Sequence, residues 1–368
     1  MSHFVVLVAL SGSLSMTEIG AAVEKALAPF HEFECTGTND QYVQNVDQLA
    51  EAREKFETDT CFTITRPDGS RAYPFNAEGN YNEEFAPFYD KAARDLKLPE
   101  GYASDHDALT KDFRSFADWA SSYYGAAIVP FGQEPDLEGD HKYGYTRVNE
   151  AGEVIELIDR TNPNKKWDWW TVGGRWSGYF RAKPGTGGVK GERGLMGSEK
   201  DAAGVDVIRK GDIDFEAEAA KITAEATAKW DKVRFVVGEH LDGFEPWAKV
   251  LERHTVDGKI TNIDAARDFY HGQAAKKALA EAARNDRDLV WIELDDFLAT
   301  REEFVQARIA GARTPFAYLD KDGAWHQKGR MGWFATVSDE NHDWPGDFAK
   351  EFAKLDDQDW LVAVDCHI

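Results

Sequence analysis

Cysteine and positive charge are scarce in this sequence, and long apolar runs are missing. Three cysteines in 368 residues, Cys35, Cys61 and Cys366, form an odd set without paired spacing. This argues against a disulfide framework and favours a reducing compartment. The apolar start, Met1–Leu10, has no basic residue before it and is too short for a signal peptide or a membrane span. We therefore expect a cytoplasmic protein without a membrane partner.

The shortage of basic side chains gives a net charge of −23, from 43 Lys and Arg against 66 Asp and Glu. Duplex DNA is therefore not expected as a partner, because binding it requires many basic contacts to phosphates. High net charge chiefly serves solubility. Two other interpretations stay open: a decoy that imitates nucleic-acid phosphates, and an inhibitor whose acidic surface binds a basic protein.

The charge is distributed unevenly along the chain. Residues 1–140 carry 25 acidic and 10 basic side chains, whereas residues 160–193 carry eight basic and two acidic ones. A basic stretch inside an acidic chain predicts a local site for an anion.

The apolar pattern predicts an α+β fold. His3–Leu10 and Trp360–His367 are nearly continuous apolar runs, typical of buried central strands, and we expect them in the same sheet. The sheet should be mixed or antiparallel, with helices packed on one face and helical insertions. A hairpin is predicted around Asn149–Gly152 and a strand at Leu289–Leu294. Helices are predicted at 16–27, 46–56, 81–96, 107–123, 213–237 and 264–284.

Three segments describe the expected domain organisation. Residues 1–182 form an N-terminal α/β region with a Trp-rich strand, and residues 205–368 form a C-terminal α/β region that could share its sheet. Residues 183–204 are rich in Gly and Lys and lack periodicity, so we expect an exposed, mobile loop or a domain junction.

Residues 162–180 are the most unusual segment, with four Trp within ten residues and the pair Gly173–Gly174 before Arg175. Two glycines allow a close backbone approach, a guanidinium can hold phosphate or carboxylate by two bonds, and Trp faces can stack a base or sugar. The alternative is a structural Trp cluster with Arg175 in an internal ion pair. The predicted ligand-binding residues are Lys165, Lys166, Trp167, Asp168, Trp169, Arg175 and Trp176.

Two titratable residues are candidates for catalysis. His31 and Glu32 follow a helix stop, and histidine is the commonest acid–base residue; the alternative is a surface or hydrogen-bonded histidine without a catalytic role. Asp365 and His367 share a strand face and would join His3 if the terminal strands pair. They lack zinc spacing, so no metal is predicted, and no cofactor is indicated.

Several motifs of known chemistry are absent. The chain has no P-loop, no dinucleotide-binding glycine motif, no H-E-x-x-H, no C-x-x-C and no G-x-S-x-G. His271, in a helical pattern, and His326, on a hairpin, are weaker candidates. The common nucleotide hydrolases, dehydrogenases and serine hydrolases are therefore disfavoured.

Four segments resemble a family of uncharacterised bacteriophage and prophage accessory proteins. They are the opening M-S-H-F, the motif A-P-F-H-E-F-E-C-T-G at 28–37, the motif N-P-N-K-K-W-D-W-W-x-x-G-G-R-W-S-G at 162–178, and the ending V-D-C-H-I. The family brings no activity, so no catalytic residue is carried over. The resemblance implies an accessory protein in the cytoplasm of a bacterial host cell.

These observations predict a protein that binds a phosphate-bearing small molecule or nucleotide on its basic, Trp-rich segment. For a phage protein, sequestering a host nucleotide signal to counter host defence is one fitting purpose. The first alternative is a nucleotide-directed hydrolase or transferase with His31 and Glu32 as acid–base candidates and Arg175 as anion clamp. The second is an acidic inhibitor of a host protein.

Overall fold

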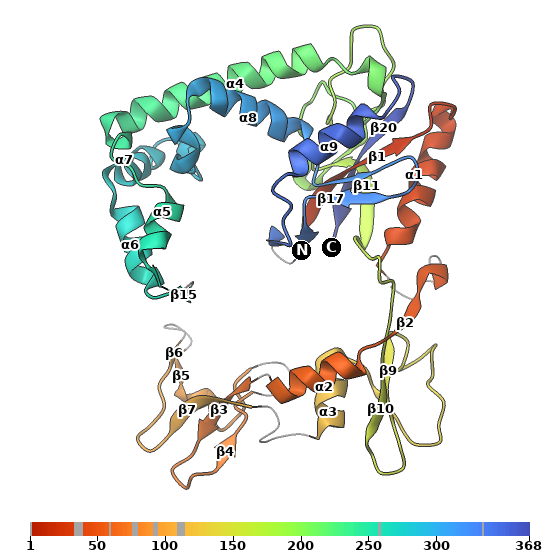
Figure 1. Cartoon of the computed structure of the whole chain (residues 1–368), viewed down its shortest axis with the longest axis vertical. Helices are drawn as coiled ribbons and strands as arrows, with labels where there is room; N and C mark the ends of the chain where they lie inside the picture. Colours follow the sequence, from red (N-terminus) through yellow and green to blue (C-terminus); the bar gives the residue numbers. More distant parts are fainter. Residues whose placement is uncertain are drawn as a thin grey trace. The chain divides into compact units, whose positions relative to one another are not determined.

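The computed structural model describes residues 2–32, 40–58, 60–75, 80–90, 95–108, 115–256, 259–332 and 335–368. The chain divides into two compact units (Figure 1). Unit 1 comprises Met1–Leu27 and Trp169–Ile368, and unit 2 comprises Ala28–Asp168. These boundaries differ from the expected junction at 183–204, which lies inside unit 1.

The sheet of unit 1 is built around β20 (Trp360–His367). β20 pairs antiparallel with β1 (His3–Leu10) along its whole length, so the terminal strands share one sheet as predicted. Along its other edge, β20 pairs with β11 (Trp169–Gly174) and then with a shorter strand, β13. The remaining strands of this sheet are β12 (Glu192–Arg193), β13 (Val207–Arg209), β16 (Ala317–Leu319) and β17 (Trp325–Gln327).

Helices cover this sheet on two sides. Val5 and Leu7 of β1 pack with Phe348 of α9 (Trp344–Ala353) in a buried apolar cluster. A second helix, α1 (Ile19–Leu27), lies along β1, and in Figure 1 the two helices flank the sheet. The α+β class is confirmed. We expected helices on one face of the sheet, but helices lie on both. The side chains of β1 are apolar on both faces, so each face must be buried by other parts of the chain.

Residues 215–313 form a helical insertion between β13 and β16, which we call the helical arm. Its long helix α4 (Phe215–Val237) packs against α8 (Arg301–Arg313). The arm has its own buried apolar cluster, which includes Val233, Leu279 and Phe297. Its other helices are α5 (Trp247–Arg253), α6 (Ile263–Gly272) and α7 (Ala274–Ala283), and its short strands are β14 (Thr255–Val256) and β15 (Lys259–Ile260).

The predicted strand at Leu289–Leu294 is wrong. This stretch runs between two 3₁₀ turns, η9 (Arg287–Leu289) and η10 (Leu294–Leu298), without strand pairing. Its apolar side chains Leu289, Ile292 and Leu294 are buried in the cluster of the helical arm. A short apolar run can fill a helical core as readily as a sheet, which is why the pattern misled.

Unit 2 contains the predicted hairpin, formed by β9 (Gly144–Val148) and β10 (Val154–Thr161). α2 (Leu49–Thr58) and α3 (Phe116–Tyr124) contribute to a buried cluster with Leu157 of β10. The predicted helix at 81–96 is wrong where it is described, since these residues form a 3₁₀ turn and short strands. The other strands are β2 (Gln44–Asp47), β3 (Thr60–Thr65), β4 (Arg71–Ala72), β5 (Tyr89–Asp90), β6 (Asp95–Leu96), β7 (Ala103–Ala108) and β8 (Ile128–Val129).

Candidate functional site

The predicted ligand-binding residues are divided between the two units. Lys165, Lys166, Trp167 and Asp168 belong to unit 2, together with His31 and Glu32, whereas Trp169, Arg175 and Trp176 belong to unit 1. The sequence segment that looked continuous therefore supplies two separate local structures.

In unit 2, His31 is buried. Its Nε2 lies 3.1 Å from the carbonyl oxygen of Asp168, and its ring packs against that of Trp167 at 4.5 Å between centroids. Glu32 forms an ion pair with Lys165 at 3.5 Å. Buried, hydrogen-bonded histidines usually serve structure, so this geometry favours the alternative stated for His31. Residues 33–37 of the same motif lie outside the described residues.

In unit 1, the Trp and Arg side chains have different surroundings. Trp169 is 42% exposed and stacks on His367 at 5.4 Å between ring centroids, while Trp176 is partly buried against the sheet's apolar cluster. Arg175 is exposed, and its guanidinium makes no ion pair or hydrogen bond with any described residue. No described residue provides the internal ion partner that the alternative for Arg175 requires.

The terminal strands bring together the polar residues that were expected to meet. His3 lies opposite His367, their ring centroids are 4.9 Å apart, and His3 Nδ1 lies 2.9 Å from Asp365 Oδ1. Within the described chain, this trio is not gathered closely enough to share a metal ion. Asp365 is 1% exposed, so its pairing with His3 anchors the sheet's end.

The glycine pair provides the close approach that its sequence suggested. Gly174 has a positive φ of 56°, and a Cβ at this position would lie 2.3 Å from Asp365 Oδ2. The space holds the Asp365 carboxylate instead, which accepts a hydrogen bond from the backbone N–H of Arg175 at 2.9 Å. Gly174 thus turns the chain out of β11 into residues 175–206, which we call the rim loop.

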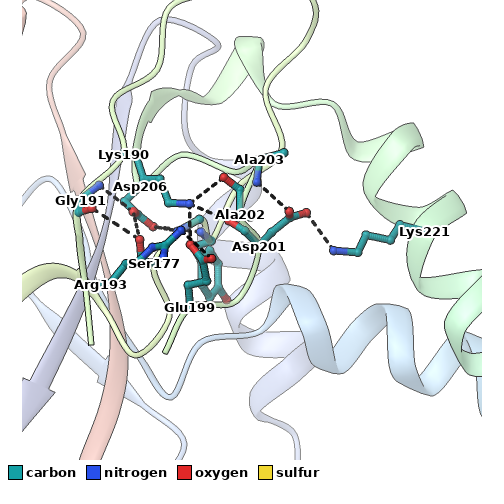
Figure 2. Close-up of polar contacts among 12 residues, drawn as sticks. Ser177, Lys190, Gly191, Arg193, Glu199, Asp201, Ala202, Ala203, Asp206 and Lys221 are labelled. Atoms are coloured by element: carbon teal, nitrogen blue, oxygen red, sulfur yellow. Dashed lines mark hydrogen bonds and ion pairs between the residues drawn. The ribbon is translucent and has the colours of Figure 1, made fainter. Parts of the chain in front are cut away.

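Asp206 organises the rim loop from its far end (Figure 2). This carboxylate is fully buried and accepts hydrogen bonds from the backbone N–H groups of Gly178, Tyr179 and Gly191 at 2.7–2.9 Å. The Ser177 hydroxyl donates a fourth bond at 3.3 Å. No Lys, Arg or His side chain among the described residues forms an ion pair with this carboxylate. Backbone dipoles can hold a buried carboxylate in this way.

Ion pairs tie the middle of the rim loop to itself and to the helical arm. Lys190 Nζ donates to Glu199 at 2.7 Å and to the carbonyl of Ala202 at 2.7 Å. Asp201 accepts from Lys221 of α4 at 2.9 Å, a contact visible in Figure 2. Most of residues 183–204 are exposed, as predicted, but the segment is hydrogen-bonded throughout. Its mobility stays a prediction.

A cavity of about 320 Å³ lies where the rim loop meets α4 and α8, and we call it the α4–α8 pocket. This volume is in the range of small-molecule sites. Residues at helical spacing on one face of α4 form a wall, including Lys221, Ile222 and Lys229. Phe304 and Arg308 of α8 form the opposite wall. Apolar and charged groups thus face one space.

Basic side chains outnumber acidic ones in this pocket, in contrast to the chain as a whole. Five basic residues line it, against the acidic Asp201, Glu218 and Glu225. Lys229 is exposed and makes no ion pair or hydrogen bond with any described residue. The basic residues are Arg181, Lys200, Lys221, Lys229 and Arg308.

Lys200 stands at the junction of the loop and the arm. Its Nζ donates to the carbonyls of Tyr179 at 3.2 Å and Ala312 at 3.0 Å and lies 3.6 Å from the centroid of the Tyr179 ring. Desolvation by the surrounding protein lowers the pKa of Lys200 to about 8, although Glu218 opposes this shift. A lysine whose pKa is lowered beside a cavity is typical of functional sites.

Sequence reasoning missed this pocket. Its basic residues are separated by up to about 130 positions, and only Arg181 lies within the basic stretch that the charge pattern singled out. The sequence pattern that pointed to the pocket was the spacing of Lys221 and Lys229, which places them on one helix face. The same spacing is typical of a solvent-exposed helix surface.

Comparison with protein-family models, curated proteins and solved structures finds no match for this chain. Among the described helices, none combines the length and apolarity that crossing a membrane requires.

Proposed function

We propose that this protein binds a phosphate-bearing small molecule or nucleotide, and that the ligand occupies the α4–α8 pocket. The observation that carries the proposal is the excess of basic side chains around a cavity of about 320 Å³ in a chain of net charge −23. Among these bases, Arg181, Lys221 and Arg308 pair with Asp201 or Asp296. Lys229 is instead left without a partner among the described residues.

The chemistry of the two walls supports a ligand with a charged and an apolar part. Lys229 offers a cationic donor to phosphate oxygens. The Arg308 guanidinium, which also pairs with Asp296 at 2.6 Å, is suited to two-pronged contacts. Ile222, Ala226 and Phe304 supply apolar surface for a ring. A bare phosphate would leave this apolar surface unused, whereas a nucleotide would use both.

Isothermal titration calorimetry with ADP, pyrophosphate and adenosine tests the proposal. We expect saturable binding of ADP, weaker binding of pyrophosphate and none of adenosine. Lys229→Glu should lower the affinity for ADP at least about tenfold, because it reverses an exposed charge at the site. The matched control is Lys277→Glu on α7, an exposed lysine that lies outside the pocket. Equal affinities of both variants, or no binding of any phosphate-bearing probe, would contradict the proposal.

Proton linkage gives an independent signature of the same site. An anion bound beside Lys200 raises its pKa from about 8, so binding at pH 8 should take up roughly half a proton per chain. Titrations in buffers of different ionisation enthalpy measure this uptake. It should disappear in Lys200→Gln. Sequestration of a host nucleotide signal by a phage protein stays a prediction within this proposal.

A further inference from the structure

A second cluster of chemically active side chains lies in unit 1, outside the α4–α8 pocket. Asp320 follows β16, His326 is in β17 and Glu351 is on α9. One ligand atom from each lies within 4.8 Å of the other two. All three side chains are only partly buried, so an ion from solvent could reach them.

We propose that Asp320, His326 and Glu351 form a binding site for a divalent transition-metal ion of the Zn²⁺ type. Zn²⁺ bonds to imidazole nitrogen and carboxylate oxygen at about 2.0–2.2 Å. Neighbouring ligands of such an ion lie roughly 3.0–3.4 Å apart. Asp320 Oδ2 and His326 Nε2, 2.9 Å apart, are close to that spacing.

The supporting contacts orient the ligands as metal sites require. Asp320 Oδ1 accepts hydrogen bonds at 2.9 Å from the backbone N–H groups of Asp322 and Ala324. These two bonds fix the carboxylate and leave Oδ2 directed at His326. Such outer contacts hold the geometry of ligating carboxylates.

The buried surroundings hold the three elements in place and contain a further polar group. Tyr318, opposite His326 in the strand register, is 1% exposed, and its ring contacts that of Phe348 on α9. The Tyr318 hydroxyl makes no hydrogen bond with any described residue and is electrostatically coupled to Asp320 and Glu351. The packing of Tyr318 against Phe348 therefore holds β16 and α9 together beside the three proposed ligands.

The donor set selects the kind of ion. Ca²⁺ and Mg²⁺ prefer oxygen ligands only, whereas one imidazole with two carboxylates suits Zn²⁺, Mn²⁺ or Fe²⁺. Three protein ligands leave at least one position for water. Glu351 also pairs with Lys354 at 2.6 Å, but that lysine is 68% exposed on its side chain and can move into solvent.

Glu351 distinguishes a metal site from a simple hydrogen bond between His326 and Asp320. Chelator-treated protein is titrated with Co²⁺, which reports imidazole ligation by its visible absorption, and with Zn²⁺ in calorimetry. We expect one tight ion per chain above the weak background of surface carboxylates. His326→Gln and Glu351→Gln should each weaken this binding at least about tenfold.

Two controls keep the experiment decisive. His240→Gln removes an exposed histidine of the helical arm and should leave the tight site unchanged. Circular dichroism confirms that each variant is folded, and Glu351→Gln leaves the Asp320–His326 contact intact. The proposal would be overturned if the unmutated protein bound no Co²⁺ or Zn²⁺ tightly at one ion per chain. It would also be overturned if Glu351→Gln bound the ion as tightly as the unmutated protein.

Discussion

The rim loop and the helical arm are two insertions into the same sheet unit, and they are ordered by different forces. The arm buries an apolar cluster that includes Val233 and Phe297. The rim loop buries Tyr179 and Phe180 in the apolar cluster of the sheet, and its backbone converges on the carboxylates of Asp206 and Asp365. A loop without a core of its own is therefore held by the core of the sheet and by two buried carboxylates, Asp206 at its end and Asp365 on β20.

The difference also explains how the α4–α8 pocket is assembled. The loop supplies Arg181 and Lys200, held by backbone geometry, and the arm supplies a regular helix face with Lys221 and Lys229. Hydrophobic packing positions one wall and polar contacts position the other. Mutations in the two regions should consequently change the free energy of unfolding by different amounts and with different dependence on pH.

The largest effect is expected in the arm, where Phe297 is 1% exposed and its ring lies 4.7 Å from that of Phe304. Phe297→Ala should lower the free energy of unfolding by about 3–5 kcal/mol, through lost burial and the cavity left behind. Urea denaturation measures this loss. The control Phe235→Ala removes a ring that is 88% exposed and should cost no more than about 0.5 kcal/mol. Similar losses in both variants would refute apolar packing as the arm's main support.

The rim loop should respond most strongly to Asp206→Asn, which keeps the size of the side chain and removes its charge. One amide oxygen cannot accept all the N–H groups that the carboxylate accepts, so we expect a loss of about 2–3 kcal/mol. Limited proteolysis should then cut first within residues 183–204. Asp357→Asn, at an exposed acid of unit 1, is the matched control. A loop that stays resistant in the Asp206 variant would show that other contacts order it.

The sheet unit should also show a specific acid sensitivity at Asp359. Burial raises the pKa of Asp359. Hydrogen bonds from Lys321 and from the N–H groups of Asp356 and Gly12 outweigh this effect, so the pKa lies below its ordinary value. The unfolded chain then binds more protons, so this stabilisation is present above pH about 3.9 and is lost as pH falls through the folded-state pKa. Asp359→Asn should reduce the slope of stability against pH below 4. An unchanged slope would argue against this pairing.

The smallest effect is expected from Arg175→Gln. Because its side chain is exposed and its guanidinium forms no hydrogen bond or ion pair with any described residue, the free energy of unfolding should change by less than about 0.5 kcal/mol. Arg209→Gln is the contrast, since that guanidinium lies 4.2 Å from the Trp360 ring centroid and should cost more. Calorimetry with ADP then compares two sites. Unchanged affinity supports the α4–α8 pocket, whereas a large loss would restore the Trp-rich segment as the ligand contact.

Short apolar runs and glycine pairs in the sequence predicted the strands and the close backbone approach that they form in the structure. Continuous apolar runs located β1 and β20, and the glycine pair marked the approach of Asp365 to Arg175. The role of Asp206 could not be predicted from the sequence. Its carboxylate oxygens accept hydrogen bonds from N–H groups 15 to 28 residues away, and no periodic pattern in the sequence marks such contacts. The pocket required α4 and α8 to meet across an intervening set of helices, which charge counts along the chain do not report.

The central position of β20 has a consequence for synthesis of the chain. β1 emerges from the ribosome well before its antiparallel partner β20, which lies about 350 residues later in the chain. At roughly 5–20 residues per second, β1 and β11 wait on the order of tens of seconds with an apolar edge unpaired. During that interval the nascent chain depends on α1, on chaperones or on transient pairing to stay out of aggregates. Folding of unit 1 therefore cannot be completed before β20 has been synthesised, and a chain truncated shortly before residue 360 would have both flanks of its sheet and no centre.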